Sequence, residues 1–567
     1  MNIKQEIQKS LEKASGIKNP HVEFSSKTEF GDYTTNIAIQ NKLNAKELIS
    51  KLNDDNDLKK IVSKIEIAGP GFINFHLNTK VLTNNLSQII EQKGKYGNSE
   101  KNKGKTWLIE HTSPNPNKAM HLGHLRNNIL GMAIANIWQT TGVRVIRDDI
   151  DNNRGIAIAK LMWGYLKFAN KNKKEITDIN YWYEHQDEWS EPSDSNIRPD
   201  RFVDELYARA SIDFENEENE KKIRQIVINW EKDDKITWEL WKKVLEYSYR
   251  GQQLTLKRLG NIHDKVWHEH EHYKKGKEIV EDGLKKGIFK NGKGGAIVTD
   301  LKKYNLPDTV VIKSDGTALY ITQDLALTKL KIETFHPNHL FWVIGPEQSL
   351  ALKQLFAVCE QLGIGKLDMF THIAFGFMSI KGQGKMSSRK GNVVYIDDLI
   401  DEAKEKIIKM HSINNNLAEE IALGAIKYSI LKVGRMQDIA FDFNESLSFE
   451  GNSGPYIQYT YARAQSILNK SNKKPKLSDV IMNEEENLIE RLLSRFPEII
   501  ELAATSYSPN ILCEYLYNVA SLFNTYYNKV QIIGSENEEF KLALTFSVGQ
   551  ILKNGLNLLG IEAPGKM

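Results

Sequence analysis

One stretch of the sequence constrains the fold most. Residues 108–127 read LIEHTSPNPNKAMHLGHLRN. The apolar run Trp107–Glu110 predicts a strand, the proline-containing segment after it predicts a loop, and the apolar run that follows His121 predicts a helix. A helix that starts just after a strand binds anions, because its first N–H groups are unpaired and its dipole favours negative charge. His121, Gly123 and His124 at this point indicate a nucleotide phosphate site, since glycine lets a ligand approach the backbone.

A second candidate phosphate-binding segment strengthens the interpretation of the first. Taken alone, a short His-Gly-His run is more often a solvated turn or a satisfied helix cap. Residues 381–392 read KGQGKMSSRKGN, in which cationic side chains alternate with glycine and serine. Such a loop would hold triphosphate oxygens by charge-assisted hydrogen bonds, and it follows a predicted strand at the edge where open α/β sheets bind ligands. Taken alone, this segment reads equally well as a solvated basic loop.

The pattern from Trp107 onward predicts a parallel sheet. Short apolar runs alternate with amphipathic helical segments, which is typical of an α/β domain with a Rossmann-like parallel-sheet core. The predicted strands are Trp107–Glu110, Val143–Arg147, Thr309–Ile312, Leu340–Ile344 and His372–Phe377.

Length and pattern divide the chain into three regions. A chain of 567 residues is too long for one core and suggests roughly three to four domains. We expect a small α/β module at 1–95, the parallel-sheet domain at 96–395 with an insertion at about 171–260, and an all-helical bundle at 396–567. The predicted bundle helices are Leu417–Val433, Gly454–Leu468, Glu484–Ala504, Pro509–Lys529 and Glu538–Leu559. Several tryptophans and tyrosines favour a folded insertion over a disordered linker.

Composition narrows the class of protein only slightly. The net charge of +3 excludes neither nucleic acid nor other partners, because lysines can gather on one face. The two cysteines, Cys359 and Cys513, are too few for a cysteine-ligated zinc site and fit a reducing compartment. No signal peptide or membrane-spanning run is visible, so we expect a cytoplasmic protein without membrane contact.

The two phosphate-binding segments together resemble the two sequence motifs of class I aminoacyl-tRNA synthetases, HLGH and KMSSR. The family's roles for these motifs are to meet the α-phosphate and the departing pyrophosphate of ATP, largely by positioning and electrostatic stabilisation. The family often has a second lysine where this chain has Ser388, so Lys118 and the cations after Ser388 are alternative sources of that charge. The resemblance implies ATP-binding roles for His121, Gly123, His124, Lys385, Met386, Ser387 and Arg389, and catalytic roles for His121, His124, Lys118 and Lys385.

The residues around the motifs resemble the arginyl-tRNA synthetase family in particular. The stretch before HLGH and the run Tyr320-Ile321-Thr322-Gln323-Asp324 match that family's patterns. Recognition of a guanidinium group requires carboxylates with planar, bidentate geometry. The resemblance implies that arginine is bound by Glu110, Ser113, Asn115, Tyr320, Asp324 and Gln348. For each residue alone, a surface acid or a core tyrosine is the more common interpretation.

The resemblance extends over nearly the whole chain. Phe30–Tyr33 and Gly69–Asn74 resemble the family's N-terminal domain, which contacts the elbow of tRNA. The segment from Gly454 resembles the entry to its helical anticodon-binding domain, where tyrosines would stack on bases and arginine would meet phosphate. This implies tRNA-binding roles for Tyr456, Tyr459 and Arg463, although Tyr456 and Tyr459 read almost equally well as core residues.

The resemblance implies an arginine–tRNA ligase. Its substrates would be ATP, L-arginine and tRNA(Arg), with Mg²⁺ accompanying ATP and no dedicated protein metal site, and we expect a monomer. Three alternatives are another class I synthetase, a catalytically silent RNA-binding paralogue, and a nucleotidyltransferase of the same fold. The missing zinc ligands and the modest length weigh against another class I synthetase. The two intact motifs weigh against a silent paralogue, and the flanking domains weigh against a nucleotidyltransferase.

Overall fold

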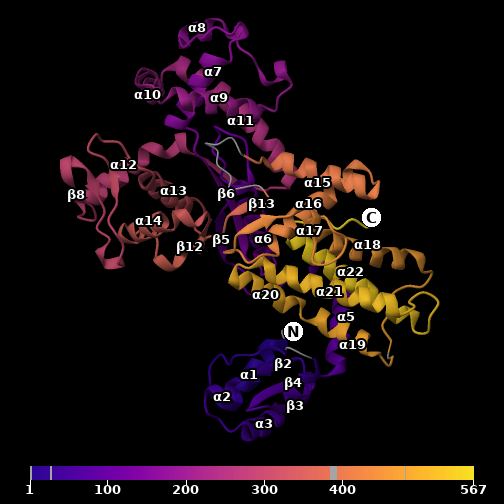
Figure 1. The fold of residues 1–567 in the computed structure, drawn as a ribbon. Helices are drawn as coiled ribbons and strands as arrows, with labels where there is room; N and C mark the ends of the chain where they lie inside the picture. Colours follow the sequence, from indigo (N-terminus) through magenta and orange to yellow (C-terminus); the bar gives the residue numbers. More distant parts are fainter. Residues whose placement is uncertain (1–2, 26–27, 383–392, 479) are drawn as a thin grey trace.

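A computed structural model describes residues 3–25, 28–382, 393–478 and 480–567 (Figure 1). A small α/β module lies at one end of the molecule, a parallel sheet lies at its centre, and the C-terminal helices pack between them. The insertion extends from the opposite end of the central sheet. The predicted combination of a parallel-sheet core, an N-terminal α/β part and an all-helical C-terminal part is confirmed.

The N-terminal module is a four-stranded antiparallel sheet covered by helices. The sheet has the order β1-β2-β4-β3, and the predicted hairpin of β3 and β4 is confirmed, with Gly69 and Gly71 at positive φ in its turn. Its elements are α1 (Ile3–Ser15), β1 (Glu23–Phe24), β2 (Tyr33–Thr35), α2 (Ile37–Gln40), α3 (Ala45–Asn53), α4 (Asn56–Ile61), β3 (Val62–Ala68) and β4 (Phe72–Leu77). The helix that follows, α5 (Thr79–Gln92), packs against the C-terminal helices.

The central sheet has five strands, all parallel, in the order β12-β11-β5-β6-β7. Such an order places the ends of β5 and β11 side by side, where open α/β sheets bind ligands. Around the sheet lie α6 after β5 and three helices from later segments. The elements are β5 (Thr106–Glu110), α6 (Leu122–Gln139), β6 (Arg144–Asp151), β7 (Lys265–His268), α12 (Glu269–Lys285), α13 (Tyr320–Phe335), β11 (His339–Val343), α14 (Ser349–Gln361) and β12 (Phe370–Ile373).

One predicted strand of the central sheet is wrong. The Thr309–Ile312 run forms β10 (Val310–Ile312), which pairs antiparallel with β9 (Ile297–Val298). Together with β8 (Lys290–Asn291) it makes a separate three-stranded sheet. The edge of the central sheet is β7 instead, a strand the sequence did not reveal because KVWH is short and mixes charged with apolar residues.

The insertion is folded and helical. It contains α7 (Ile156–Phe168), α8 (Ile179–Glu184), α9 (Pro199–Asp213), α10 (Glu217–Glu231) and α11 (Lys235–Leu259). Trp182 and Trp189 are fully buried in its own core, which confirms the prediction from its aromatic content. The long helix α11 runs back to the central sheet and ends at Gly260 in the left-handed conformation.

The C-terminal part is a helical bundle that shares one hydrophobic core with α6. The predicted helix Glu484–Ala504 is wrong as a single element, because the chain breaks at Arg495 and Pro497 opens a second helix without donating an N–H. A parallel pair, β13 (Met378–Ile380) with β14 (Ile439–Phe441), joins the bundle to the region of the central sheet. The helices are α15 (Ile396–His411), α16 (Asn415–Leu431), α17 (Phe443–Ser446), α18 (Gly454–Lys470), α19 (Glu484–Ser494), α20 (Phe496–Ser506), α21 (Pro509–Lys529) and α22 (Glu538–Leu558).

Candidate active site

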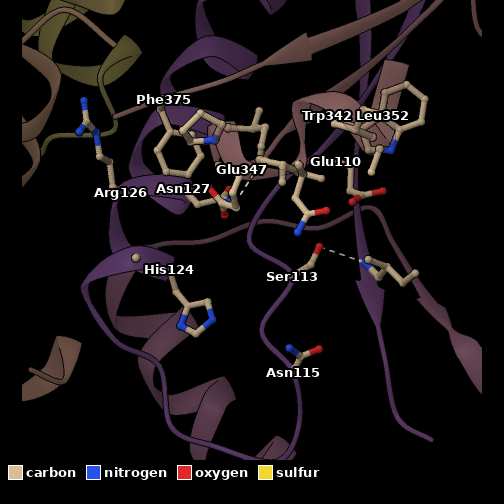
Figure 2. Close-up of a pocket in the computed structure, with 18 of the residues that line it drawn as sticks. Glu110, Ser113, Asn115, His124, Arg126, Asn127, Trp342, Glu347, Leu352 and Phe375 are labelled. Carbon is tan, nitrogen blue, oxygen red and sulfur yellow. Dashed lines mark hydrogen bonds between the residues drawn. The ribbon is translucent and has the colours of Figure 1, made fainter. Parts of the chain in front are cut away.

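A cavity of about 1000 Å³ lies at the carboxyl ends of β5 and β11. Its walls come from the loop after β5, the start of α6, the first turns of α13, the loop after β11 and the segment around β13. Figure 2 shows Glu110 at one end and His124 at the other, with Ser113 and Asn115 along the loop between them. The cavity is therefore long enough to present different side chains to the two ends of one ligand.

The histidines of HLGH close the N-terminus of α6. His121 is the N-cap residue, and its Nδ1 accepts a hydrogen bond from the backbone N–H of Gly123 (3.2 Å). In return, the Nδ1 of His124 accepts the N–H of His121 (3.2 Å). Because each Nδ1 is an acceptor, each ring carries its proton on Nε2 and is a hydrogen-bond donor there.

Both imidazoles are neutral near pH 7. Burial, and then the nearby charge of Lys118, lowers the pKa of His121 to about 4. Burial, followed by the neighbouring His121 and Lys118, lowers the pKa of His124 well below its usual range. The two rings lie with their centroids 4.1 Å apart. This end of the cavity thus offers neutral imidazole donors and the positive end of the α6 dipole, and the two histidines add no full charge.

The helix cap leaves little room for a side chain at Gly123. A Cβ built on Gly123 would lie 3.2 Å from Cε1 and 3.3 Å from Nδ1 of the His121 ring. Any larger residue would therefore push that ring away from the hydrogen bond that it accepts. The sequence predicted close approach of a ligand, and the structure adds this second reason.

The opposite end of the cavity is a cluster of charged groups. Glu110 at the end of β5 accepts a hydrogen bond from Lys331 (Oε2 to Nζ, 2.5 Å), and Asp148 on β6 is 2.7 Å from the same ammonium group. The indole N–H of Trp267 also donates to Asp148 (2.8 Å). Asp324 on α13 lines the same end. Burial, and then the charge of Glu110, raises the pKa of Asp324 to about 7.

Between the two ends, the loop after β5 presents small polar groups. Ser113 Oγ accepts the backbone N–H of Ile150 (3.2 Å), and Asn115 Oδ1 accepts Asn152 Nδ2 (3.2 Å). These bonds to the end of β6 fix both side chains in the wall. Gln348 lines the facing wall, and Tyr320 stands at the rim with 83% of its surface exposed.

The structure brings most of the predicted site residues together. The cavity is lined by Glu110, Ser113, Asn115, His121, Gly123, His124, Tyr320, Asp324 and Gln348. Lys118 is not part of the lining, although its charge acts on both histidines. Lys385, Met386, Ser387 and Arg389 lie outside the described residues.

Several residues that shape the cavity escaped the sequence analysis. Buried Arg126 donates to three backbone carbonyls, those of Phe377 (2.8 Å), Arg435 (3.0 Å) and Gln437 (2.7 Å), and so ties α6 to the segments before β13 and β14. Asn127 accepts the N–H of Thr112 (2.9 Å) and donates to the carbonyl of Val343 (2.8 Å). A charged residue inside the apolar helix after HLGH was the available signal for Arg126.

A second group of predicted residues lies on the helical bundle. On α18, the guanidinium of Arg463 lies over the rings of Tyr459 (4.9 Å) and Tyr527 (5.0 Å) and donates to Asn524 Oδ1 (2.5 Å). Tyr459 and Tyr527 are exposed, whereas Tyr456 is half-buried. These side chains form a partly exposed cationic and aromatic surface of α18 and α21, outside the cavity lining.

The Phe-Gly-Asp-Tyr segment fixes the N-terminal module to the bundle. The Tyr33 hydroxyl donates to Glu498 Oε1 on α20 (2.8 Å), and Asp32 forms an ion pair with Arg491 on α19. Tyr33 is buried by this contact. Asp32 and Tyr33 therefore position the module, and the second predicted segment, 69–74, carries the exposed Phe72.

The described ranges contain neither a metal-binding cluster nor a membrane-spanning helix. Among these residues no group of three or more His, Cys, Asp or Glu side chains is arranged to hold a metal ion. No helix in the same ranges is both long enough and apolar enough to cross a membrane.

The parallel sheet and the cavity at its carboxyl edge define a class I aminoacyl-tRNA synthetase catalytic domain. Residues 85–443 match the family model described as tRNA synthetases class I (R), catalytic domain. Residues 1–77 match the arginyl tRNA synthetase N terminal domain, and residues 457–567 match the DALR anticodon binding domain. The chain belongs to the arginyl-tRNA synthetase family, and the family predicted from its motifs is confirmed.

Relatives match over most of the chain. The arginine–tRNA ligase of Borrelia garinii subsp. bavariensis is 34% identical over 600 residues, covering 100% of this chain and 99% of the relative. That of Phocaeicola vulgatus is 35% identical over 492 residues, covering 81% of this chain and 80% of the relative. The structure of Thermus thermophilus arginyl-tRNA synthetase matches with a TM-score of 0.81 over 100% of both chains at 24% identity, which shows the same fold.

Proposed function

We propose that the chain is an ATP-dependent arginine–tRNA ligase. The carboxylate of L-arginine attacks the α-phosphorus of ATP, pyrophosphate leaves, and the arginyl group passes from the adenylate to the terminal ribose of tRNA(Arg). One observation carries this proposal: a single cavity has a carboxylate cluster at one end and the capped start of α6 at the other. Arginine and ATP would meet between them, at Ser113 and Asn115.

The charged end would select the side chain of arginine. Glu110 and Asp324 would accept the planar guanidinium fork, with Tyr320 closing over it from the rim. Ser113, Asn115 and Gln348 would hold the ammonium and carboxylate ends of the substrate. An amino acid without a guanidinium group would leave buried acceptors unpaired, at a cost on the order of 1–3 kcal/mol for each group.

The histidine end would bind ATP. The Nε2–H groups of His121 and His124 would donate to the α-phosphate as negative charge builds on it, and the positive end of the α6 dipole would stabilise that charge. Mg²⁺ would enter with ATP and neutralise its phosphates. Lys118 and Lys385 are the candidate lysines for the departing pyrophosphate. Comparing the single-turnover rates of Lys118→Ala and Lys385→Ala would show which lysine has that role. Equal, small losses in the two variants would refute both assignments.

The tRNA would contact the flanking domains. We assign residues 1–95 to a tRNA-binding module, 96–395 to the catalytic domain and 396–567 to anticodon binding. Tyr456, Tyr459 and Arg463 lie on α18, where exposed rings stack on unpaired bases and a guanidinium meets phosphate. Affinity for tRNA should fall steeply with salt, and Arg463→Ala should reduce the slope of log affinity against log salt by about one.

The same proposal includes a monomer that works in the cytoplasm. Every side chain assigned to arginine or ATP within the described residues comes from one chain and one cavity, so no second copy is needed to complete it. Sedimentation of the purified protein at micromolar concentration tests the monomer, and cell fractionation tests the compartment.

Arginine-dependent exchange of pyrophosphate into ATP tests the function. The assay is run with and without tRNA(Arg), and with lysine in place of arginine. We expect exchange with arginine under at least one condition and far less with lysine. Absence of exchange under every condition, with tRNA binding retained, would identify a silent RNA-binding paralogue instead.

A further inference from the structure

The guanidinium end of the cavity contains a cation of its own. Lys331 lies on α13, seven residues after Asp324 and therefore on nearly the same face of the helix. Its side chain is 1% exposed, although it lines the cavity. A lysine this deeply buried is rare unless it is paired, and it lies beside the residues assigned to arginine.

The ammonium group of Lys331 bridges two carboxylates. It is 2.5 Å from Glu110 Oε2 and 2.7 Å from Asp148 Oδ2, two residues that are neighbours in register on β5 and β6. Trp342 lies beside it, with the Nζ atom 5.8 Å from the ring centroid. Within the described part of the chain no hydrogen bond reaches Glu110 Oε1, so Lys331 fixes one oxygen of Glu110 and leaves the other for a ligand.

This arrangement also fills a binding position. The space between Glu110 and Asp148 suits a compact ammonium ion with short contacts to both carboxylates, and the protein has placed its own ammonium ion there. At this end of the cavity an incoming substrate then meets Glu110 Oε1 and Asp324. A planar guanidinium can bridge two such acceptors with parallel N–H groups, whereas an ammonium group cannot.

We propose that Lys331 is a positioning and specificity-determining residue of the arginine site. It holds Glu110 in the orientation that accepts a guanidinium, and it occupies the place where the ammonium group of a competing lysine would bind. Specificity is thus achieved partly by excluding the wrong ligand. The inference rests on the proposed function, because it concerns the same site.

The test compares Lys331→Met with the unchanged enzyme in pyrophosphate exchange. We expect the KM for arginine to rise by roughly tenfold to a hundredfold, because Glu110 is no longer held in place. The KM for ATP should stay within twofold. Free lysine should become a stronger competitive inhibitor relative to arginine, since the position between Glu110 and Asp148 is vacant. A general weakening of the fold would not produce this selective change.

A compensated variant guards against misfolding. Removing Lys331 leaves two buried carboxylates without a counter-ion, and this can unfold the protein. In Lys331→Met/Asp148→Asn the cluster keeps one net negative charge, as in the unchanged protein, but Glu110 still lacks its partner. This double variant should fold and should still show a raised KM for arginine with an unchanged KM for ATP.

Lys427→Met is the matched control. Lys427 is also a buried lysine, but it donates to the carbonyls of Leu259 (2.9 Å) and Gly560 (2.6 Å), outside the cavity lining. Its loss should not change the ratio of the two KM values. If the unchanged enzyme shows no arginine-dependent exchange, the proposed function fails. If it does, and both Lys331 variants keep the KM for arginine and the weak inhibition by lysine, the role of Lys331 is overturned.

Discussion

The two ends of the cavity are suited to charged groups of opposite sign, and they differ in the side chains that they use. The end that we propose binds arginine uses full charges: Glu110, Asp148 and Lys331 are in close contact, and Asp324 is nearby. The end that we propose binds ATP uses neutral histidines and the N-terminus of α6. A guanidinium must be distinguished from other cations, which requires acceptors at fixed places. Phosphate charge that grows during the reaction is better met by preorganised dipoles.

The charged end of the cavity also carries an electrostatic cost that the histidine end avoids. Buried carboxylates favour the protonated form, so Asp324 has a raised pKa until a cation arrives. The two histidines avoid this problem because each is neutral and hydrogen-bonded to the helix backbone. Electrostatic strain is therefore concentrated where specificity is needed, and the ATP end is a conventional helix cap.

The largest effect should come from the charged end. Asp324→Ala should lower kcat/KM for arginine by about 10³-fold, because an ion pair in a partly buried site loses one partner. Affinity for tRNA should remain nearly unchanged, since Asp324 lies in the cavity. Pyrophosphate exchange and filter binding measure the two quantities.

Asp315→Asn is the control for Asp324→Ala. Asp315 precedes the same helix but lies exposed in a turn, where it accepts the N–H of Thr317 (2.9 Å). The Asp315→Asn substitution should keep kcat/KM for arginine within a factor of two of the value for the unchanged enzyme. If Asp324→Ala weakened tRNA binding as much as arginine use, Asp324 would have a structural role instead.

A smaller effect is expected at the neutral end. His124→Ala should lower kcat by roughly 10²-fold, the usual cost of one donor to a developing negative charge. In the unchanged enzyme with saturating arginine, kcat should be independent of pH from about 6 to 8, because the pKa of His121 is about 4 and that of His124 is well below its usual range. Loss of activity as either imidazole titrated near pH 6.5 would mean that a charged histidine takes part.

The smallest effect concerns the cap itself. Gly123→Ala should displace the His121 ring and lower the free energy of unfolding by about 1 kcal/mol, as when a helix N-cap is lost. Thermal unfolding measures this change. Gly94→Ala, where an added Cβ has no neighbouring atom within 4 Å, is the control. An equal loss in both variants would indicate a general cost of alanine and no special role for the cap.

The predicted site residues that are close in sequence also lie close together in the structure. Glu110, Ser113, Asn115 and HLGH lie within one strand, loop and helix start, so their spacing nearly fixes their geometry. The Tyr320 to Asp324 run lies on one helical turn and was recognised by resemblance. Resemblance of the motifs predicted the family, and hydrophobic periodicity predicted the parallel sheet and the helical C-terminal part.

The remaining features depend on contacts between distant segments. Lys331 contacts two strands that lie far away in sequence, and Arg126 binds three carbonyls from two separate loops. The Thr309–Ile312 strand was assigned to the wrong sheet because its apolar pattern does not say which strand it pairs with. Side-chain contacts and strand pairings between distant segments are set by the fold, so the local sequence pattern does not predict them.

Proton release on arginine binding tests the charged end most directly. Asp324 has a pKa of about 7 in the empty site, and a bound guanidinium favours its ionised form, so affinity should rise as pH increases through 7. Calorimetry at pH 7 in buffers of different ionisation enthalpy should detect release of about half a proton for each arginine bound, and none for Asp324→Asn. No release by the unchanged protein, or equal release by the variant, would contradict the account.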